Sequence, residues 1–230
     1  MEIAIDTSTA LASIALSNEG EMISELTWHS RQNHSVELVP NIVHLLHQAK
    51  IEAKSLGAIF VAKGPGSFNG LRVGVSTAKG LAFALEIPLV GISTLELEAY
   101  PFAFTGLPIC PIHTAGRGEI AIAFYKQNDE WHCLEPEHII TAEILCQQVT
   151  DKTIFCGEIP PSVITELQQK LSDKAIMPDS ATRLRRASHL VTLGWGNLKK
   201  GMKDDPASLQ PIYLRQPPIM QRKDETIKKK

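Results

Sequence analysis

Residues 64–85 read GPGSFNGLRVGVSTAKGLAFAL, and this stretch says most about the fold. It follows an apolar run at Leu56–Ala62 that predicts a buried strand. From Gly70 to Leu85 the apolar residues recur every three or four positions, which predicts a helix. Three glycines, a proline and a serine separate these two elements. The stretch therefore predicts a strand, a glycine-rich turn and a helix in succession.

The glycine-rich turn is a candidate phosphate site. Glycine lets the backbone approach an anion closely, and the first turn of a helix supplies aligned amides. The pattern is not GxxxxGK[ST], so the loop is not a P-loop. The alternative is a purely structural turn in which Ser67 or Asn69 caps the helix. The candidate phosphate-binding residues here are Gly64, Gly66, Ser67, Gly70 and Arg72.

The N-terminus predicts a hairpin with a polar turn. Glu2–Ile5 and Leu11–Leu16 read as strands, and Asp6, Thr7 and Ser8 begin the turn between them. A carboxylate at a strand end can hold magnesium through water, and turn amides and hydroxyls can surround phosphate oxygens. The alternative is a turn whose aspartate and serine cap their own backbone.

Two predicted helices, 35–50 and 70–85, are apolar on more sides than one packing stripe requires. Because large apolar patches usually mark association sites, we expect both helices to form a protein interface. The competing explanation is that the second apolar flank packs beneath the sheet. The expected interface residues are Val36, Val39, Val43 and Leu46 on the first helix and Gly70, Gly74, Ala78 and Ala82 on the second.

A boundary is expected at residues 101–108, where both helix and strand patterns lapse. Beyond it, strands at 107–112 and 119–126 around a turn repeat the plan of residues 2–16, which suggests an internal repeat of about a hundred residues. Further expected elements are a strand at 153–156 and helices at 142–149, 161–171 and 187–200. The expected domains are an N-terminal lobe at 1–100, a smaller C-terminal lobe at 101–221 and a disordered basic tail at 222–230.

The composition excludes several classes of protein. The 230 residues carry a formal net charge of −2, so the chain is not basic enough to hold tRNA by itself, and any RNA contact is expected only through a complex. No long apolar stretch and no signal peptide is apparent, so we expect a cytoplasmic protein without membrane contact. The four cysteines form no CxxC pair, and no HExxH is present, so no metal site is expected. The basic residues Arg183, Arg185 and Arg186 are read as a solvated face or an RNA contact.

Four segments together carry a family resemblance. They are IAIDTSTALASIAL at 3–16, His34-Ser35 before an apolar helix, the stretch at 64–85, and PIYLR at 211–215. In content and order they resemble the TsaB (YeaZ) family, strongly over residues 1–98. The resemblance implies an α/β chain with the two-lobed actin/hsp70/sugar-kinase-like (ASKHA) fold and a degenerate second lobe.

The resemblance also implies a function. TsaB is a non-catalytic paralogue of TsaD, the subunit that transfers threonylcarbamoyl to the adenosine beside the tRNA anticodon. We accordingly expect a scaffold that binds a TsaD-like subunit, with a TsaE-like ATPase completing the assembly, and a homodimer when the chain is alone. No cofactor is required of this chain, although weak or interface-bound ATP or ADP with magnesium is compatible with its two turns.

Departures from TsaD-like enzymes and from the family's own motifs also argue against a catalytic metal and against nucleotide binding. Where TsaD-like enzymes place a metal-binding HxxxH pair, this chain has Thr94 and Glu98, a poor set for a transition metal. The family's GPGSFTG carries Asn69 here, its second-lobe Asp-Ala-Arg turn reads Thr114-Ala115-Gly116, and its later GxG turn reads 157–159 Gly-Glu-Ile. The rival functions are an active ATPase or small-molecule kinase using Asp6 and the 64–70 loop, and a metalloprotease, which the missing histidine pair disfavours.

Overall fold

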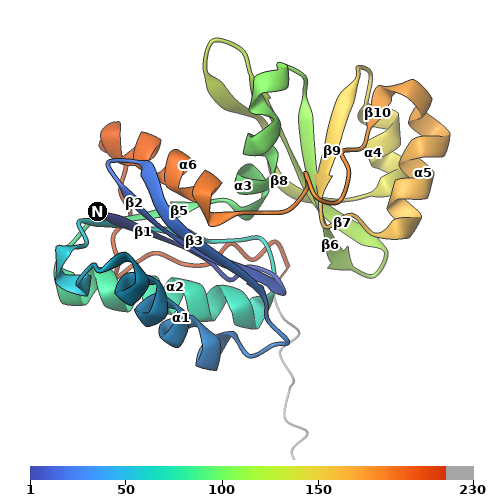
Figure 1. The fold of residues 1–230 in the computed structure, drawn as a ribbon. Coiled ribbons are helices and arrows are strands. Elements are labelled where there is room, and N and C mark those ends of the chain that lie inside the picture. Colours follow the sequence, from blue (N-terminus) through green and yellow to red (C-terminus); the bar gives the residue numbers. More distant parts are fainter. Residues whose placement is uncertain (216–230) are drawn as a thin grey trace, which may run out of the picture.

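A computed structural model describes residues 1–215 of the chain, which fold into two lobes (Figure 1). Each lobe is built on a five-stranded mixed sheet. The central strands of the first sheet, EIAID and AIFVA, are buried along their whole length, as expected for strands covered on both faces. The chain is therefore α/β and two-lobed, as the sequence predicts.

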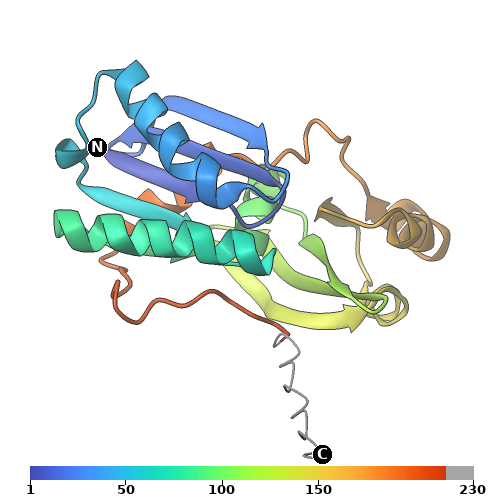
Figure 2. The ribbon, with the colours of Figure 1, turned by 90° about the horizontal axis from the view of Figure 1, so that it is seen from below.

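The first sheet has the strand order β3-β2-β1-β4-β5, with β1 antiparallel to β2 and parallel to β4. Helices α1 and α2 lie side by side across one of its faces (Figure 2). The elements of this part of the chain are β1 (Glu2–Asp6), β2 (Leu11–Asn18), β3 (Glu21–His29), α1 (His34–Ala49), the 3-10 turn Ala53–Ser55, β4 (Ala58–Ala62), α2 (Phe68–Leu85) and β5 (Leu89–Ile92).

The second sheet repeats this plan in the order β8-β7-β6-β9-β10, with corresponding parallel and antiparallel neighbours. The internal repeat is thus confirmed, although β10 is reduced to two residues. The elements are α3 (Thr94–Ala99), the 3-10 helix Tyr100–Thr105, β6 (Ile109–Gly116), β7 (Glu119–Gln127), β8 (Trp131–Thr141), α4 (Ala142–Gln148), β9 (Thr153–Gly157), α5 (Pro161–Leu171), the 3-10 turn Ser172–Lys174, β10 (Ala175–Ile176) and α6 (Ala187–Lys199).

The last helix of each repeat packs on the sheet of the other lobe. Helix α3, which follows the first sheet, contacts β6, β7 and β9, while α6 contacts β1, β2, β4 and β5. The predicted division at residue 101 is therefore wrong for α6, which covers the second face of the first sheet opposite α1 and α2 (Figure 1). The physical reason is that the apolar side of α6, including Leu190 and Val191, completes the core around Phe60.

The C-terminal segment also returns to the first lobe. The amide of Asp204 donates to Leu89 O at 2.7 Å, and the amide of Ile212 donates to Lys63 O at 2.7 Å. Residues 204–212 therefore run beside the first sheet, away from the lobe to which the sequence assigned them. The predicted tail at 222–230 lies outside the described residues.

Five of the eight positions predicted for the helical interface are buried within the chain. Gly70, Gly74, Ala78 and Ala82 are buried against the chain's own first sheet, and Leu46 lies in the same core. The competing explanation, packing beneath the sheet, holds for these five positions. By contrast Val36, Val39 and Val43 on α1 are 68, 53 and 60 % exposed. Only these three valines of the expected interface are available to a partner.

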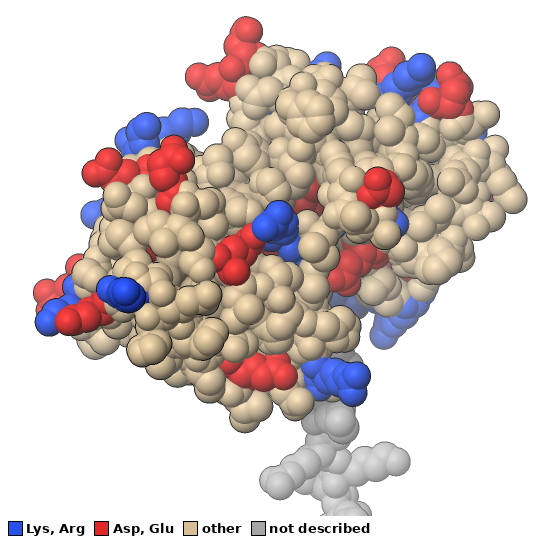
Figure 3. All heavy atoms as spheres, viewed as in Figure 1, with Lys and Arg blue, Asp and Glu red and all other residues tan. Residues whose placement is uncertain are grey.

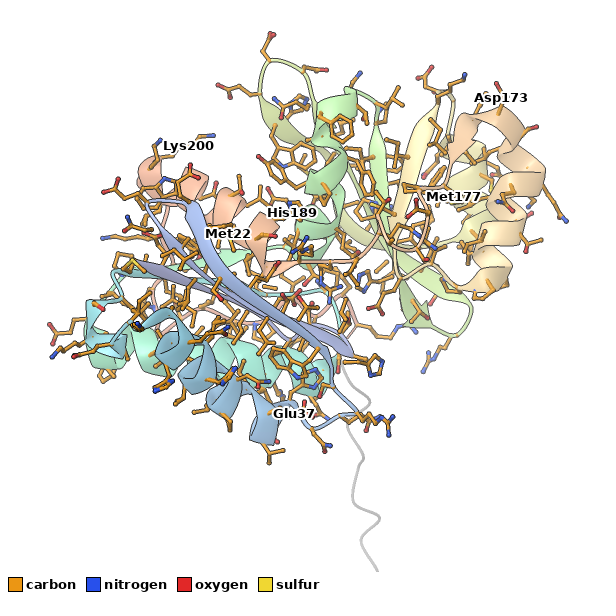
Figure 4. The ribbon with its side chains drawn as sticks, viewed as in Figure 1. Met22, Glu37, Asp173, Met177, His189 and Lys200 are labelled. Carbon is orange, nitrogen blue, oxygen red and sulfur yellow. The ribbon has the colours of Figure 1, made fainter. Side chains whose placement is uncertain are left out.

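Two contacts fix α1 on the sheet. The indole Nε1 of Trp28 on β3 donates to Glu37 Oε2 at 3.0 Å, and the ring of His34 is 2.9 Å from Thr9 O. In Figure 4, Glu37 lies in the first turns of α1 below β3. None of the helices among residues 1–215 is long and apolar enough to cross a membrane.

Candidate functional site

The candidate site lies between the lobes, where the polar turn after β1 meets the loop before α2. Asp6, Thr7 and Ser8 are all buried. Asp6 Oδ1 accepts the amide of Ser8 at 2.9 Å and its hydroxyl at 2.6 Å. The hydroxyl of Thr7 donates to Gly70 O at 2.8 Å. The turn thus binds its own backbone and the start of α2.

The glycines of the 64–70 loop bring the two loops together. The amide of Ser67 donates to Ser8 O at 2.6 Å, and Ser67 Oγ caps α2 by accepting the amide of Gly70 at 3.4 Å. A Cβ at Gly66 would collide with Ser8 O, and one at Gly70 would collide with Thr7 O. These glycines therefore allow close approach of backbone to backbone, and Ser67 caps the helix as the structural alternative expects.

Arg185 occupies the centre of the cleft. Its Nε donates to Asp6 Oδ2 at 2.5 Å, its Nη1 to Glu98 Oε1 at 2.7 Å and its Nη2 to Thr9 Oγ1 at 2.7 Å. The ring of His113, from β6 of the second lobe, lies 2.7 Å from Glu98 Oε2 through Nε2. Asp6, Glu98, His113 and Arg185 are each at most 5 % exposed. The result is a buried polar network that joins both lobes.

The docking of α6 brings Arg185 to this position. The amide of Ala187 donates to Ser13 Oγ at 3.1 Å, and that of Ser188 donates to Glu25 Oε1 at 2.9 Å. An acidic side chain at a helix N-terminus is electrostatically favourable. Strands β2 and β3 thus hold the first turn of α6, and the residue two positions before it enters the cleft.

The neighbouring carboxylates keep Arg185 a cation despite its burial. Burial lowers the pKa of Arg185, but the carboxylates of Asp6 and Glu98 outweigh burial and raise the pKa above its ordinary value. Two carboxylates therefore share one buried guanidinium.

A magnesium–nucleotide complex does not fit this arrangement. A metal at Asp6 would have to share the carboxylate with the positively charged guanidinium of Arg185, which binds Oδ2, while Oδ1 already accepts twice from Ser8. The predicted residues Asp6, Thr7, Ser8, Gly64, Gly66, Ser67 and Gly70 do come together. Around Asp6 they contact protein groups, whereas Gly66 also lines a cavity between the loop and the second lobe.

The other candidates lie at or beyond the edge of this site. Arg72 is exposed, stacks on the ring of Phe68 at 3.8 Å from its centroid and donates to Tyr213 OH at 3.2 Å. Thr94 Oγ1 accepts the amide of Gly64 at 3.1 Å. Within residues 1–215 no three His, Cys, Asp or Glu side chains converge as a metal site requires.

Sequence reasoning missed Arg185 and the role of His113. In the sequence, Arg185 belongs to one basic cluster with Arg183 and Arg186, and only burial separates it from them. A single arginine before a helix carries no local signal of burial, because its carboxylate partners lie 87 and 179 residues away in the chain.

Comparison with known proteins places the chain among its relatives. Residues 22–223 match the family model described as "TsaD: tRNA N6-adenosine threonylcarbamoyltransferase". The "tRNA threonylcarbamoyladenosine biosynthesis protein TsaB" of Bacillus subtilis is 34 % identical over 218 residues, which cover 93 % of both chains. The chain belongs to the TsaB family. The Escherichia coli TsaB protein is 27 % identical over 93 % of this chain and 94 % of its own length.

Solved structures agree with the fold of the TsaB family. YeaZ from Pseudomonas aeruginosa superposes with a TM-score of 0.77 at 23 % identity, covering 93 % of this chain and 99 % of the other. The ethanolamine utilization protein EutJ from Carboxydothermus hydrogenoformans gives a TM-score of 0.51 at 9 % identity, over 83 and 89 % of the two chains. These likenesses, together with the duplicated sheet, support the two-lobed ASKHA-like fold.

Proposed function

We propose that this chain is a non-catalytic scaffold subunit for the synthesis of threonylcarbamoyladenosine in tRNA. Membership of the TsaB family supports the pathway. In this proposal the chain binds a TsaD-like catalytic subunit in the cytoplasm, a TsaE-like ATPase completes the assembly, and tRNA is bound only through the complex. The chain itself needs no cofactor.

The buried guanidinium of Arg185 is the observation that carries the non-catalytic part of the proposal. An ATPase of this fold would use Asp6 for its metal, and here that carboxylate is bound by Arg185 and Ser8. Breaking such contacts in a buried site is costly, because the carboxylate is left without a counter-charge until the metal arrives. This argues against the kinase alternative and equally against ATP or ADP bound at Asp6.

The exposed valines of α1 support the partner-binding part. Val36, Val39 and Val43 follow one another at helical spacing on its outer side. Glu37 is the single Asp, Glu, Lys or Arg in this helix, and the surface over α1 in Figure 3 is largely free of such residues. An apolar, nearly uncharged stripe of this kind is typical of a protein interface. We place the TsaD-like subunit on this stripe, and a second copy of the chain there when the partner is absent.

The test is a reconstitution of tRNA modification with the TsaD-like subunit of the same organism. Omitting this chain should abolish the product, and Val39→Glu should weaken partner binding at least tenfold, about 1.4 kcal/mol. Sedimentation of Val39→Glu alone should show fewer dimers. Leu134→Glu is the matched control, because Leu134 is similarly exposed but lies on β8 of the other lobe. Normal partner binding by folded Val39→Glu would remove this interface from the proposal.

A titration with magnesium and ATP separates the scaffold from the ATPase alternative. The isolated chain should neither bind ATP saturably in the micromolar range nor hydrolyse it. Turnover by the wild-type chain that is lost in Asp6→Ala would favour the ATPase alternative.

A further inference from the structure

A cavity of about 350 Å³ lies beside the buried network and is not filled by it. It is bounded by the 64–70 loop of the first lobe, by β6, β7 and β8 of the second lobe and by the segment that ends at Arg215. Its volume lies in the range of small-ligand pockets. Because both lobes contribute, a bound molecule would touch both at once.

The walls of the cavity are apolar and partly aromatic. Phe68 and Tyr213 form one wall, with ring centroids 5.1 Å apart and planes tilted by 40°. Ile139 from β8 and Ala121 from β7 belong to the second lobe's side. Aromatic side chains of this kind stack on flat heteroaromatic rings with little regard to their substituents.

His113 adds a polar atom to this apolar lining. Its Nε2 contacts Glu98, which also accepts from Arg185 and therefore acts as a hydrogen-bond acceptor. In the neutral ring, Nε2 then carries the proton and Nδ1 is left as an acceptor. No residue in 1–215 is hydrogen-bonded to Nδ1, and His113, which is 5 % exposed, lines the cavity. The cavity thus offers an acceptor to an N–H or O–H group of a ligand.

Two arginines lie near the rim. Arg72 stacks on the Phe68 ring, and Arg215 donates to Ala115 O at 3.2 Å while pairing with Glu119. Guanidinium groups in such positions can contact phosphate. An apolar slot with one inner acceptor and arginines outside suits a ring that carries a hydrogen-bond donor and is attached to a phosphate chain.

We propose that this cavity binds a single nucleobase, stacked against Phe68 and Tyr213 with a donor directed to His113 Nδ1. The choice of a nucleobase over other heteroaromatic rings rests on the proposed function in tRNA modification. The base can come from a free nucleoside or from an unpaired position of RNA. Neither Asp6 nor Arg185 lines this cavity, and the proposed binding requires no metal.

The experiment is a calorimetric titration of the full chain with adenosine, with a short RNA hairpin carrying unpaired adenosines, and with ribose 5-phosphate. Saturable binding is expected for adenosine, the hairpin or both, and not for ribose 5-phosphate. Binding of adenosine alone identifies the free nucleoside as the source, and binding of the hairpin identifies RNA. If neither adenosine nor the hairpin binds saturably up to millimolar concentration, the proposal is overturned.

Variants locate the binding. Ile139→Trp fills the cavity and should weaken binding at least tenfold, whereas Ile144→Trp, on the exposed side of α4, should bind as the wild type does. If Ile139→Trp does not fold, Tyr213→Ala removes one wall and should weaken binding about tenfold. Undiminished binding by either folded cavity variant contradicts the proposal. Assembly with the TsaD-like subunit is measured separately through Val39→Glu, so failure of the pocket and failure of the scaffold role remain distinguishable.

Discussion

Replacing Arg185 with methionine tests the buried network most directly. Methionine keeps much of the side-chain volume but leaves Asp6 and Glu98 buried without a counter-charge. Removing one partner of a buried ion pair costs about 3–5 kcal/mol. For a chain of this size that corresponds to a fall in Tm of about 6–20 °C. Thermal and urea unfolding followed by circular dichroism would measure both quantities.

A matched control is available one residue away. Arg186 also pairs with a carboxylate, Glu25, but its side chain is 55 % exposed, so Arg186→Met should cost less than about 1 kcal/mol. Adding Asp6→Asn to Arg185→Met should recover part of the loss, because one uncompensated charge is removed. A loss below about 1 kcal/mol for Arg185→Met would refute the view that this guanidinium stabilises the buried carboxylates of Asp6 and Glu98.

Three further predictions concern packing, pH and metal. Gly70→Ala should destabilise the chain by about 1–3 kcal/mol in urea unfolding, because the added Cβ would collide with Thr7 O. Gly80→Ala on the same helix adds a Cβ that meets nothing and should stabilise the chain by up to about 1 kcal/mol. Equal effects of the two variants would contradict the packing argument. His189 lies on α6 facing the second lobe (Figure 4), and burial lowers its pKa. The free energy of unfolding should therefore fall as the pH drops below about 6.5, because the unfolded chain takes up the proton first. The Tm of His189→Gln should depend less on pH, and an unchanged dependence would exclude this residue as a cause. Elemental analysis after purification without chelator should find no stoichiometric zinc or iron, and one metal per chain would contradict the scaffold proposal.

Most helices could be predicted because the apolar periodicity of their sequences matches the faces that they bury in the fold. Helix α5 has the predicted bounds, and α1, α2, α4 and α6 begin and end within two residues of them. β8 was missed, since its mixed polar and apolar residues, WHCLEPEHIIT, give no clear alternation. The domain assignment of α6 failed for a different reason: an apolar helix face does not say which of two sheets it will cover.

For the candidate site, the sequence by itself determined which two loops carry the polar and glycine residues, and the pairing of β1 with β4 brings these loops together. The polar turn at Asp6 and the glycines at 64–70 follow parallel strands, and the carboxyl ends of such strands share one edge of a sheet. Only the tertiary structure decided what fills that edge. Arg185 reaches Asp6 because α6 crosses to the first lobe, and the small residues of α2 face the sheet because Gly70 and Gly74 must lie against Thr7. Burial and charge pairing across 179 residues of chain have no local signature, so the same residues fit an open phosphate site or a closed ion pair until the fold brings them together.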